Sequence, residues 1–173
     1  MTKKQPGSTE DSKPQQQQTS DDLTQEIPFE CTPEALQLDN QICFALYSAS
    51  NAITRTYRPL LDQLDLTYLQ YIVMMVLWQE DNISVKSLGE KVRLDSGTLT
   101  PLLKRLEAKE LLIRGRSPDD ERVRVLTLTD AGHELKQQAT IVPQQMMRQV
   151  QMSPEELQQL KGLCDQLLKN LSD

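Results

Sequence analysis

The sequence predicts a mainly α-helical protein with a small β-hairpin, arranged as a winged helix-turn-helix. Apolar residues recur at helical spacing over most of residues 33–172. The period becomes strand-like between residues 111 and 128, where β-branched residues and arginines gather. Two short helical segments joined by a tight loop directly precede this hairpin. That order of elements is typical of the winged helix-turn-helix class.

The first segment, residues 1–30, is polar and carries a glutamine run at residues 15–18. It contains few large apolar side chains, so it cannot bury enough surface to offset the entropy lost on ordering. We therefore expect residues 1–30 to form a disordered polar tail. The folded domain is expected to cover residues 31–173.

A long helix is expected over residues 33–58. Thr32 supplies a capping hydroxyl, and Pro33 suits the first helical position. Apolar residues then recur every three or four positions. Pro59 is expected to end the helix just before it, because a proline disfavours helical backbone in the preceding residue.

Three more helices are expected before the hairpin. One covers about residues 67–80, and residues 82–84 then form a short extended link. Ser84 caps a short helix that runs to about Val92, and another helix covers about residues 96–109. The buried stripe of this last helix is expected to be Leu99, Leu102, Leu103 and Leu106.

The hairpin is expected to pair residues 111–116 with residues 122–128, through a turn at residues 117–120. A helix then covers residues 130–150, with a bend expected at Pro143.

The final helix begins with a capping box, in which Ser153 caps and Glu156 reaches back three residues later. Its apolar residues Leu157, Leu160, Cys164, Leu167 and Leu171 recur in steps of three and four, as in a coiled-coil seam. A helix so rich in apolar residues is expected to pack against another subunit, which predicts a homodimer.

The net charge of -6 is unevenly distributed. Residues 86–124 carry ten basic and seven acidic side chains, and they form the only segment with a positive balance. This basic segment coincides with the two short helices and the hairpin. A local cationic face binds phosphates even when the whole protein is acidic. Double-stranded DNA is therefore the expected partner.

The exposed face of the helix at residues 96–109 and the hairpin supply the candidate DNA-binding residues. Small and hydroxyl side chains let the backbone approach DNA, whereas lysine and arginine neutralise phosphates or contact guanine. Arginine is also attracted to a narrow minor groove. The alternative interpretation is that these charges form a solvated surface. The candidates are Ser96, Gly97, Thr98, Thr100, Pro101, Lys104, Arg105, Arg114, Arg116, Asp120, Arg122 and Arg124.

Two motifs resemble the MarR (multiple antibiotic resistance regulator) family of transcriptional regulators. Asp120-x-Arg122, followed after five residues by Leu128-Thr129, resembles the wing signature of that family. Residues 96–107 resemble its recognition helix. The resemblance covers about residues 33–172.

This resemblance implies an obligate two-fold dimer that binds a palindromic operator, with repression as the usual outcome. In such a dimer, residues 33–58 and 130–172 are expected to form the dimerisation helices. Residues 83–128 are expected to form the DNA-binding winged helix. The coiled-coil seam of the last helix points to a dimer independently.

The three cysteines lie far apart and form no Cys-x-x-Cys pair, and His133 is the only histidine. Neither a disulfide framework nor a zinc site is indicated, so we expect no metal and no cofactor. No apolar run approaches the length of a membrane span, and the first residues lack an apolar signal region. A cytoplasmic location without a membrane partner is the expectation.

Cys43 lies beside the apolar stripe of the first helix, on one line with Tyr47. A lone cysteine in an apolar helix is usually a small core residue, which is the alternative interpretation. However, residues 38–47 resemble the organic hydroperoxide resistance (OhrR) branch of the MarR family. In that branch a cysteine at this place senses peroxide, and tyrosines of the partner subunit hydrogen-bond its sulfur. Tyr57 and Tyr68 match those tyrosines.

The geometry of a helix agrees with a contact between subunits. Tyr57 lies about 21 Å along the helix from Cys43, so it cannot touch that sulfur in its own chain. An antiparallel partner helix could bring it close. Tyr47, one turn from Cys43, is the local neighbour.

The resemblance implies that an organic hydroperoxide oxidises the Cys43 thiolate to a sulfenic acid, which condenses with a thiol and releases the protein from DNA. Family members with two cysteines carry a second one in the fifth helix, but residues 131–150 contain none. A small thiol is therefore the favoured partner of the sulfenic acid. Cys164 and Cys31 are the second choices.

Three alternatives stay open from the sequence. A MarR-type regulator could respond to a small phenolic ligand, with Cys43 only packing. A thiol peroxidase would need an activating cation, but no lysine or arginine lies near Cys43 in the sequence, and so we do not expect an enzyme. A purely dimeric interaction module is the third alternative, and a gel-shift on the upstream promoter would exclude it.

Overall fold

The computed structural model describes residue 1, residues 33–117 and residues 120–172. The chain divides into two units, Met1–Ile42 and Cys43–Asp173. In the described part of the first unit, two 3-10 turns cover Pro33–Leu36 and Leu38–Asn40. The expected disordered tail, apart from Met1, and the expected cap at Thr32 lie outside the described residues.

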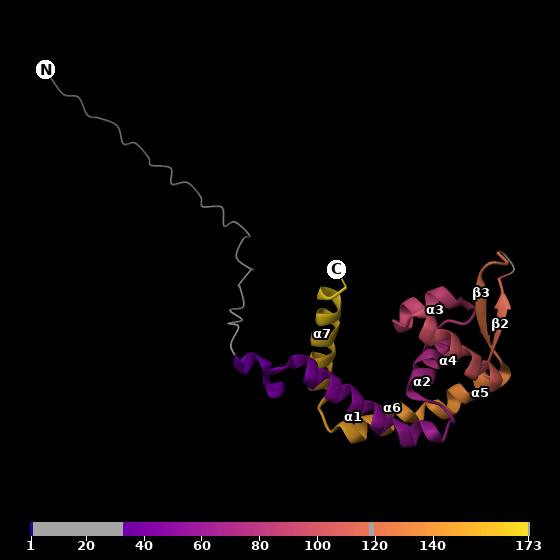
Figure 1. The fold of residues 1–173 in the computed structure, drawn as a ribbon, viewed down its shortest axis with the longest axis horizontal. Coiled ribbons are helices and arrows are strands. Elements are labelled where there is room, and N and C mark those ends of the chain that lie inside the picture. The colour runs from indigo at the N-terminus through magenta and orange to yellow at the C-terminus, as the bar shows by residue number, and fades with distance from the viewer. Residues whose placement is uncertain (2–32, 118–119, 173) are drawn as a thin grey trace. The chain divides into compact units, whose positions relative to one another are not determined.

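From Ile42 onward the described chain is mainly helical with one small sheet, as expected (Figure 1). The elements in order are α1 (Ile42–Asp62), α2 (Tyr68–Gln79), β1 (Ile83–Ser84), α3 (Val85–Val92), α4 (Ser96–Ala108), β2 (Leu112–Arg116), β3 (Arg124–Leu128), α5 (Asp130–Ala139), α6 (Ile141–Val150) and α7 (Pro154–Asn170).

The helix expected over residues 33–58 differs from the structure at both ends. Before α1, the Asn40 side chain donates a hydrogen bond to the carbonyl of Glu34 at 2.9 Å, and the Gln41 side chain donates to that of Ala35. Such side-chain bonds compete with α-helical backbone bonds and accompany the 3-10 turns.

At its other end, α1 does not stop before Pro59 but continues to Asp62. A proline inside a helix removes one backbone hydrogen bond. The side chain of Leu61, however, is only 1% exposed and belongs to the core. Its burial offsets the lost bond and keeps the last turn of α1 helical.

The three strands form an antiparallel sheet in the order β1-β3-β2. Residues 112–116 of β2 pair with residues 124–128 of β3, which confirms the expected hairpin. β1 pairs with the other edge of β3, through Ile83 opposite Leu126. The link expected at residues 82–84 therefore contributes a short third strand.

The core lies between α2, α3, α4, α5 and one face of the sheet. The expected leucine stripe of α4 is fully buried, and it meets Leu88 of α3, several apolar residues of α2 and the inward side chains of the strands. The largest fully buried side chains in this core include Leu61, Met74, Leu77, Leu88, Leu99, Leu103, Leu106, Leu112 and Leu126. This packing fixes which face of α4 points outward.

The helix expected over residues 130–150 is divided into α5 and α6, with the break at Thr140. Pro143 has no backbone N–H to donate to the carbonyl of Ala139, and its ring crowds that carbonyl. The bend expected at Pro143 is therefore displaced to the preceding turn.

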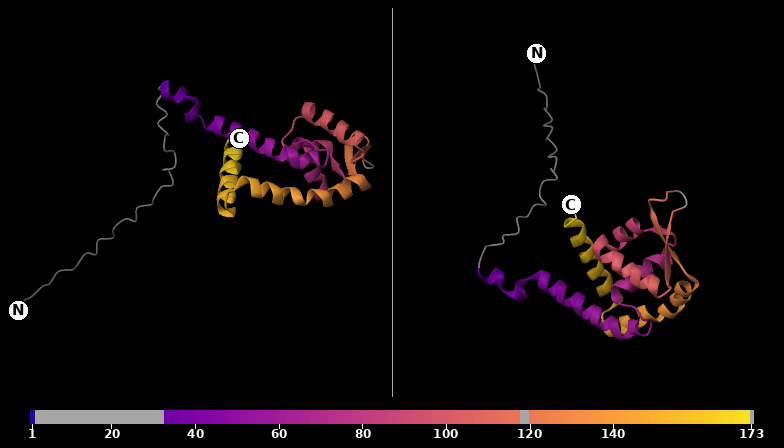
Figure 2. Two further views of the ribbon diagram at one scale, coloured as in Figure 1. Left: turned by 90° about the horizontal axis from the view of Figure 1, so that it is seen from below. Right: turned by 45° about the vertical axis from the view of Figure 1, so that its right-hand side comes forward.

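The final helix, α7, begins with the expected capping box of Ser153 and Glu156. Figure 2 shows α7 following α6 as a separate helix set at an angle to it. None of its described residues is buried, and four of its leucines are exposed. α1 likewise exposes Phe44, Tyr47 and Ile53. These helices therefore present apolar faces that the other described residues leave exposed.

No helix among the described residues combines the length and the apolar character needed to cross a lipid bilayer.

Gly132 of α5 packs directly on the segment that leads into β2. A Cβ atom at this position would clash with the carbonyl oxygen of Leu111 and lie 3.1 Å from a methyl group of Leu128. Gly132→Ala is therefore expected to lower the free energy of unfolding by about 2 kcal/mol. Urea denaturation measures this change.

The matched control is Gly115→Ala, because a Cβ at Gly115 meets no atom within 4 Å. This variant should unfold at the wild-type urea concentration or slightly above it. Equal stability of Gly132→Ala and wild type would contradict the close packing of α5 on Leu111.

Candidate nucleic-acid interface and cysteine site

α4 turns a polar face outward, opposite its buried leucines. Most of the DNA-contact candidates lie on this face, and all of these are exposed: Ser96, Gly97, Thr98, Thr100, Pro101, Lys104 and Arg105. The four leucines of the stripe are all 8% exposed or less. The helix thus offers small, hydroxyl and cationic groups to a ligand outside the domain.

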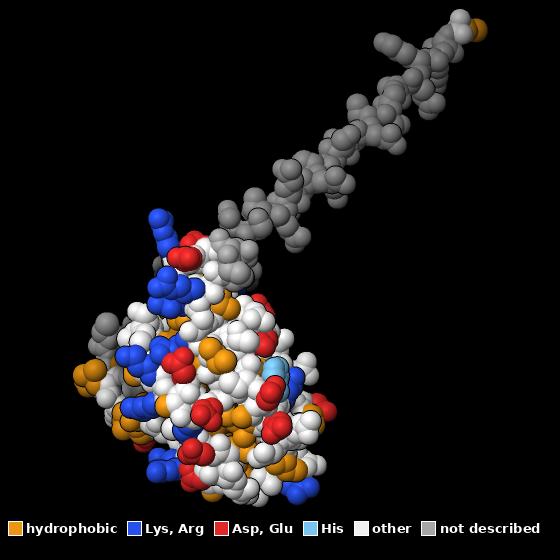
Figure 3. All heavy atoms as spheres, turned by 90° about the vertical axis from the view of Figure 1, so that its right-hand side faces the viewer, with side chains coloured by type: hydrophobic (Ala, Val, Ile, Leu, Met, Phe, Trp, Pro, Cys, Tyr) orange, Lys and Arg blue, Asp and Glu red, His pale blue; other side chains and the backbone are white. Residues whose placement is uncertain are grey.

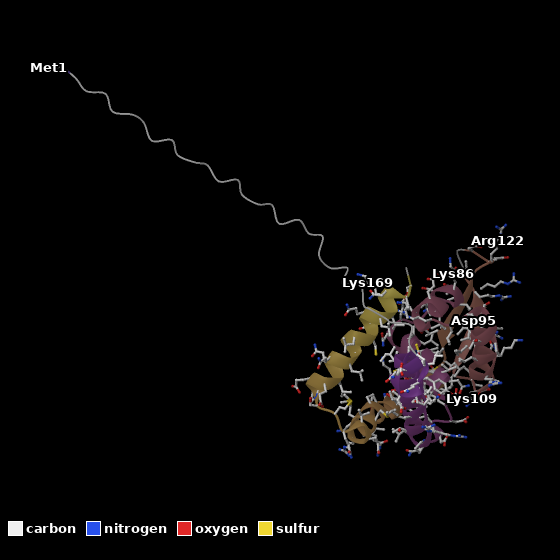
Figure 4. All side chains as sticks on the ribbon, turned by 60° about the vertical axis from the view of Figure 1, so that its left-hand side comes forward. Met1, Lys86, Asp95, Lys109, Arg122 and Lys169 are labelled. Atoms are coloured by element: carbon white, nitrogen blue, oxygen red, sulfur yellow. The ribbon has the colours of Figure 1, made fainter. Side chains whose placement is uncertain are left out.

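The first turn of α4 is held by its cap. The Asp95 carboxylate accepts hydrogen bonds from the backbone N–H and the hydroxyl of Thr98, both at 2.9 Å, and these bonds lower the pKa of Asp95. Thr100 donates its hydroxyl to the carbonyl of Ser96 at 2.7 Å. Arg93, in left-handed backbone with φ 54°, ends α3 and allows the tight turn into α4. Asp95 is labelled at this turn in Figure 4.

The described part of the hairpin tip is shaped by Asp120. Its carboxylate accepts a hydrogen bond from the backbone N–H of Arg122 at 2.9 Å, and its carbonyl accepts one from Val123 at 2.9 Å. Arg122 is exposed at the far end of the hairpin (Figure 4). Asp120 therefore orients the tip, whereas Arg122 is the residue that the tip presents.

The other hairpin arginines differ in their surroundings. Arg116 lies 3.4 Å from Glu121, and both side chains are exposed, so their ion pair is weak. Arg124, opposite Arg116 in the sheet, is exposed as well. Both therefore remain candidates for contact with phosphate.

Arg114 is engaged at the base of the hairpin. Its guanidinium donates from Nε to Glu107 of α4 at 2.7 Å and from a second nitrogen to the same oxygen, and its backbone N–H donates to the other carboxylate oxygen at 3.1 Å. Arg114, a candidate DNA contact from the sequence, instead fastens β2 to α4. The pairing also lowers the pKa of Glu107.

Figure 3 views the molecule from the side of the hairpin. Lysine and arginine side chains gather along one edge of this face, and acidic side chains lie over its centre. Cationic side chains gathered in this way can bind phosphates even though the whole protein is acidic.

Two of the expected sensor tyrosines meet where α1 ends and α2 begins. The rings of Tyr57 and Tyr68 lie 4.9 Å apart between centroids, and those of Tyr57 and Tyr71 lie 6.0 Å apart. Burial raises the pKa of Tyr57, and the neighbouring Tyr68 and Tyr71 raise it further. The Tyr57 hydroxyl therefore stays protonated at neutral pH and is able to donate a hydrogen bond.

Cys43 is exposed in the first turn of α1. It lies about 21 Å along the same helix from Tyr57, so the chain brings Tyr57 and Tyr68 together but not to this sulfur. Tyr47, one turn further on, is exposed. Cys164 of α7 is partly buried, and Cys31 lies outside the described residues.

Among the described residues, no group of three histidine, cysteine or acidic side chains has a geometry that could hold a metal ion.

Three residues near these sites were not singled out from the sequence. Tyr71 is one helical turn after Tyr68, which was a usable signal. Trp78 continues the same aromatic series two turns later. Glu107 and Arg114 have opposite charges, but they are in different elements, so only the fold reveals their contact.

The family model of the transcriptional regulators SarA and Rot matches residues 55–139. The organic hydroperoxide resistance transcriptional regulator of Bacillus subtilis is 44% identical over 136 residues, covering 79% of this chain and 92% of that protein. The chain belongs to the MarR family of transcriptional regulators.

Other MarR-type relatives agree with this placement. SarZ of Staphylococcus haemolyticus is 39% identical over 136 residues, covering 79% of this chain and 92% of that protein. A crystal structure of overoxidized AbfR bound to DNA matches with a TM-score of 0.65 and 35% identity, covering 80% of this chain and 97% of that chain. AbfR comes from Staphylococcus epidermidis. These comparisons confirm the expected family and its winged-helix fold.

The link between Glu107 and Arg114 should appear in the pH dependence of stability. A carboxyl whose pKa is lowered by folding stabilises the protein above its unfolded pKa, and that contribution is lost as the pH falls. The ordinary value for glutamate is 4.5. The glutamine of Glu107→Gln has no carboxyl group to protonate. The free energy of unfolding of this variant should therefore fall less steeply than that of wild type as the pH is lowered. Urea unfolding across the acidic range measures both slopes.

Glu121→Gln is the matched control, because Glu121 is 84% exposed and pairs only loosely with Arg116. It should keep the wild-type slope. If Glu107→Gln also keeps that slope, the ion pair does not fasten the hairpin in solution.

Proposed function

We propose that this MarR-family chain is a homodimeric DNA-binding repressor of organic peroxide resistance, released from its operator by oxidation of Cys43. One observation carries the proposal. The Tyr57–Tyr68 pair, with ring centroids 4.9 Å apart, forms at the far end of the helix that begins beside an exposed Cys43. The regulator of Bacillus subtilis that is 44% identical is named for organic hydroperoxide resistance.

Exposed apolar surface supports the dimer. Several large apolar side chains of α1, α6 and α7 are uncovered in the single chain, and contiguous patches of this kind usually mark an interface. A two-fold partner that covers them would set two copies of α4 side by side. Such a pair would read half-sites about one turn of DNA apart, so the proposed operator is palindromic.

The exposed face of α4 supports entry into the major groove. Its early turns present Ser96, Thr100 and Pro101 where base edges would lie, and Lys104 and Arg105 follow one turn later. Arg122, at the end of the hairpin, is placed to enter the neighbouring minor groove. The exposed ion pair of Arg116 with Glu121 is weak enough to exchange for a phosphate contact.

The separation of Cys43 from Tyr57 supports a sensor shared between subunits. An antiparallel α1 from the partner would bring its own Tyr57 and Tyr68 to this sulfur. Burial raises the pKa of Tyr57, so its hydroxyl is a hydrogen-bond donor at neutral pH. Hydrogen bonds from such donors stabilise a thiolate, which is the reactive form of cysteine.

The proposed chemistry is a two-electron oxidation. The Cys43 thiolate attacks the terminal oxygen of an organic hydroperoxide, a sulfur–oxygen bond forms and the oxygen–oxygen bond breaks. The peroxide is reduced to an alkoxide, which takes a proton to become the alcohol. A small cellular thiol then condenses with the sulfenic acid, giving a mixed disulfide and water, with Cys164 and Cys31 as second choices for that thiol.

Oxidation changes the hydrogen bonds that the sulfur accepts from the two tyrosines, and the subunits then adjust. A shift in the spacing of the two α4 helices weakens every operator contact together. Losing about 3 kcal/mol of binding free energy lowers the affinity more than a hundredfold.

Arg122→Ala is expected to weaken operator binding about tenfold and to lower the salt slope of the affinity by about 1, because one phosphate or minor-groove contact is lost. Fluorescence anisotropy with labelled DNA from the chain's own promoter, repeated at several salt concentrations, measures both effects. Lys161→Ala removes a charge of equal sign from α7, where Lys161 is 76% exposed, and it should leave binding unchanged. Equal losses in the two variants would argue against a contact at the hairpin tip.

Cys43→Ser is expected to bind the operator and to stay bound after treatment with cumene hydroperoxide, because it has no thiolate to oxidise. The wild type should be released and gain a mixed disulfide at Cys43, detected by mass spectrometry. Cys164→Ser is the matched control and should be released like the wild type if a small thiol resolves the sulfenic acid. Release of Cys43→Ser by peroxide would show that Cys43 is not the sensor.

A further inference from the structure

We propose that Tyr71 and Trp78 are positioning residues that transmit the state of the Tyr57–Tyr68 pair to the base of the hairpin. This inference rests on the proposed redox function and specifies the route inside one subunit. Neither side chain touches Cys43 or, in the proposed complex, DNA. Their role is to connect the two sites mechanically.

The route begins as a series of neighbouring rings that leads from Tyr57 of α1 along α2. The Tyr57 ring lies 6.0 Å from that of Tyr71, and the Tyr71 ring lies 6.2 Å from that of Trp78 in an edge-on arrangement. Tyr71 is only 3% exposed, so its ring is enclosed by the core. Because protein interiors are close-packed, a ring in this position cannot absorb a shift of Tyr57 without moving its neighbours.

The series then leaves α2 through a directed bond. Nε1 of Trp78 donates a hydrogen bond to the carbonyl oxygen of Gly132 in α5 at 2.9 Å. An indole has this one donor and no acceptor, so the bond defines the position of the ring against α5. Lys136 adds a second link between the same two helices, from its ammonium group to the carbonyl of Trp78 at 2.8 Å.

Gly132 in turn rests on the start of the hairpin. The backbone of α5 approaches the carbonyl of Leu111 so closely that no side chain fits at Gly132. The same Leu111 carbonyl accepts a hydrogen bond from Thr129 at 3.2 Å, just before α5 begins. Leu111 immediately precedes β2, so a displacement of Gly132 is passed directly to the hairpin.

The complete route therefore runs from the sensor tyrosines through Tyr71 and Trp78 to Gly132 and the hairpin. Each step is a contact between rings, a hydrogen bond, or the close packing of the Gly132 backbone against the Leu111 carbonyl. Within this route, Trp78 connects α2 to α5 through its single hydrogen bond to the Gly132 carbonyl. Removing the bond while keeping an aromatic ring should uncouple the hairpin from the sensor.

The unmodified protein offers the first test, because Trp78 is the only tryptophan in the chain. Its fluorescence should differ between reduced and peroxide-treated protein without DNA, as the indole shifts against Gly132. Cys43→Ser treated in the same way should show no change, which excludes direct damage to the indole. An identical spectrum for reduced protein and for oxidised protein that no longer binds DNA would overturn the inference.

The second test uses Trp78→Phe, which keeps a ring but has no donor for Gly132. Its reduced form should bind the operator as wild type does, and mass spectrometry should find Cys43 oxidised to the same extent. The ratio of oxidised to reduced Kd should nevertheless fall about tenfold, which is a typical size for coupling between sites. Lys136→Met, which breaks only the other link between α2 and α5, should keep the wild-type ratio.

The outcomes separate this route from the function on which it rests. A wild-type protein that peroxide does not release refutes the proposed redox function. A released wild type with an unchanged ratio in Trp78→Phe refutes the route alone, as does an equal loss in Lys136→Met. If Trp78→Phe fails to fold, shown by loss of cooperative unfolding, the fluorescence of the wild type decides.

Discussion

The length of one rigid helix constrains everything proposed for this protein. α1 holds Cys43 about 21 Å from the tyrosine pair at its other end, and a helix of this length does not shorten. The sulfur and the phenolic hydroxyls therefore meet only when two chains lie antiparallel. The exposed apolar faces of α1, α6 and α7 favour such an association, because exposed patches of this kind usually mark an interface between proteins. In the proposed mechanism, sensing and dimerisation thus depend on the same helix.

Most of the DNA-facing architecture could be predicted from the sequence because it depends on local patterns. The leucine stripe of α4 and the hairpin strands β2 and β3 follow from short sequence spacings, as does the capping box at Ser153 in the last helix. What could not be predicted depends on contacts between distant elements. β1 is a strand because it pairs with the free edge of β3. Arg114 is held by hydrogen bonds to Glu107, which belongs to a different element.

The two prolines show how packing overrides a local rule. Pro59 and Pro143 each lack a donor and crowd the carbonyl four residues earlier. Pro59 is tolerated within α1 because Leu61 is buried two residues later. Before Pro143 the chain instead separates into α5 and α6 at Thr140. The sequence alone does not distinguish these outcomes, because they depend on the tertiary contacts of the turn that follows each proline.

Thr98 and Thr100 commit their hydroxyl protons to Asp95 and Ser96 within α4. Toward a base edge, each therefore offers an oxygen lone pair and a methyl group, but no donor. In the major groove, the amino groups of adenine and cytosine both suit the lone pair, whereas only thymine offers a methyl group for the apolar contact. Guanine, which presents only acceptors there, gains nothing from either residue. In the proposed complex, this part of α4 favours adenine–thymine pairs and leaves the recognition of guanine to Lys104 and Arg105.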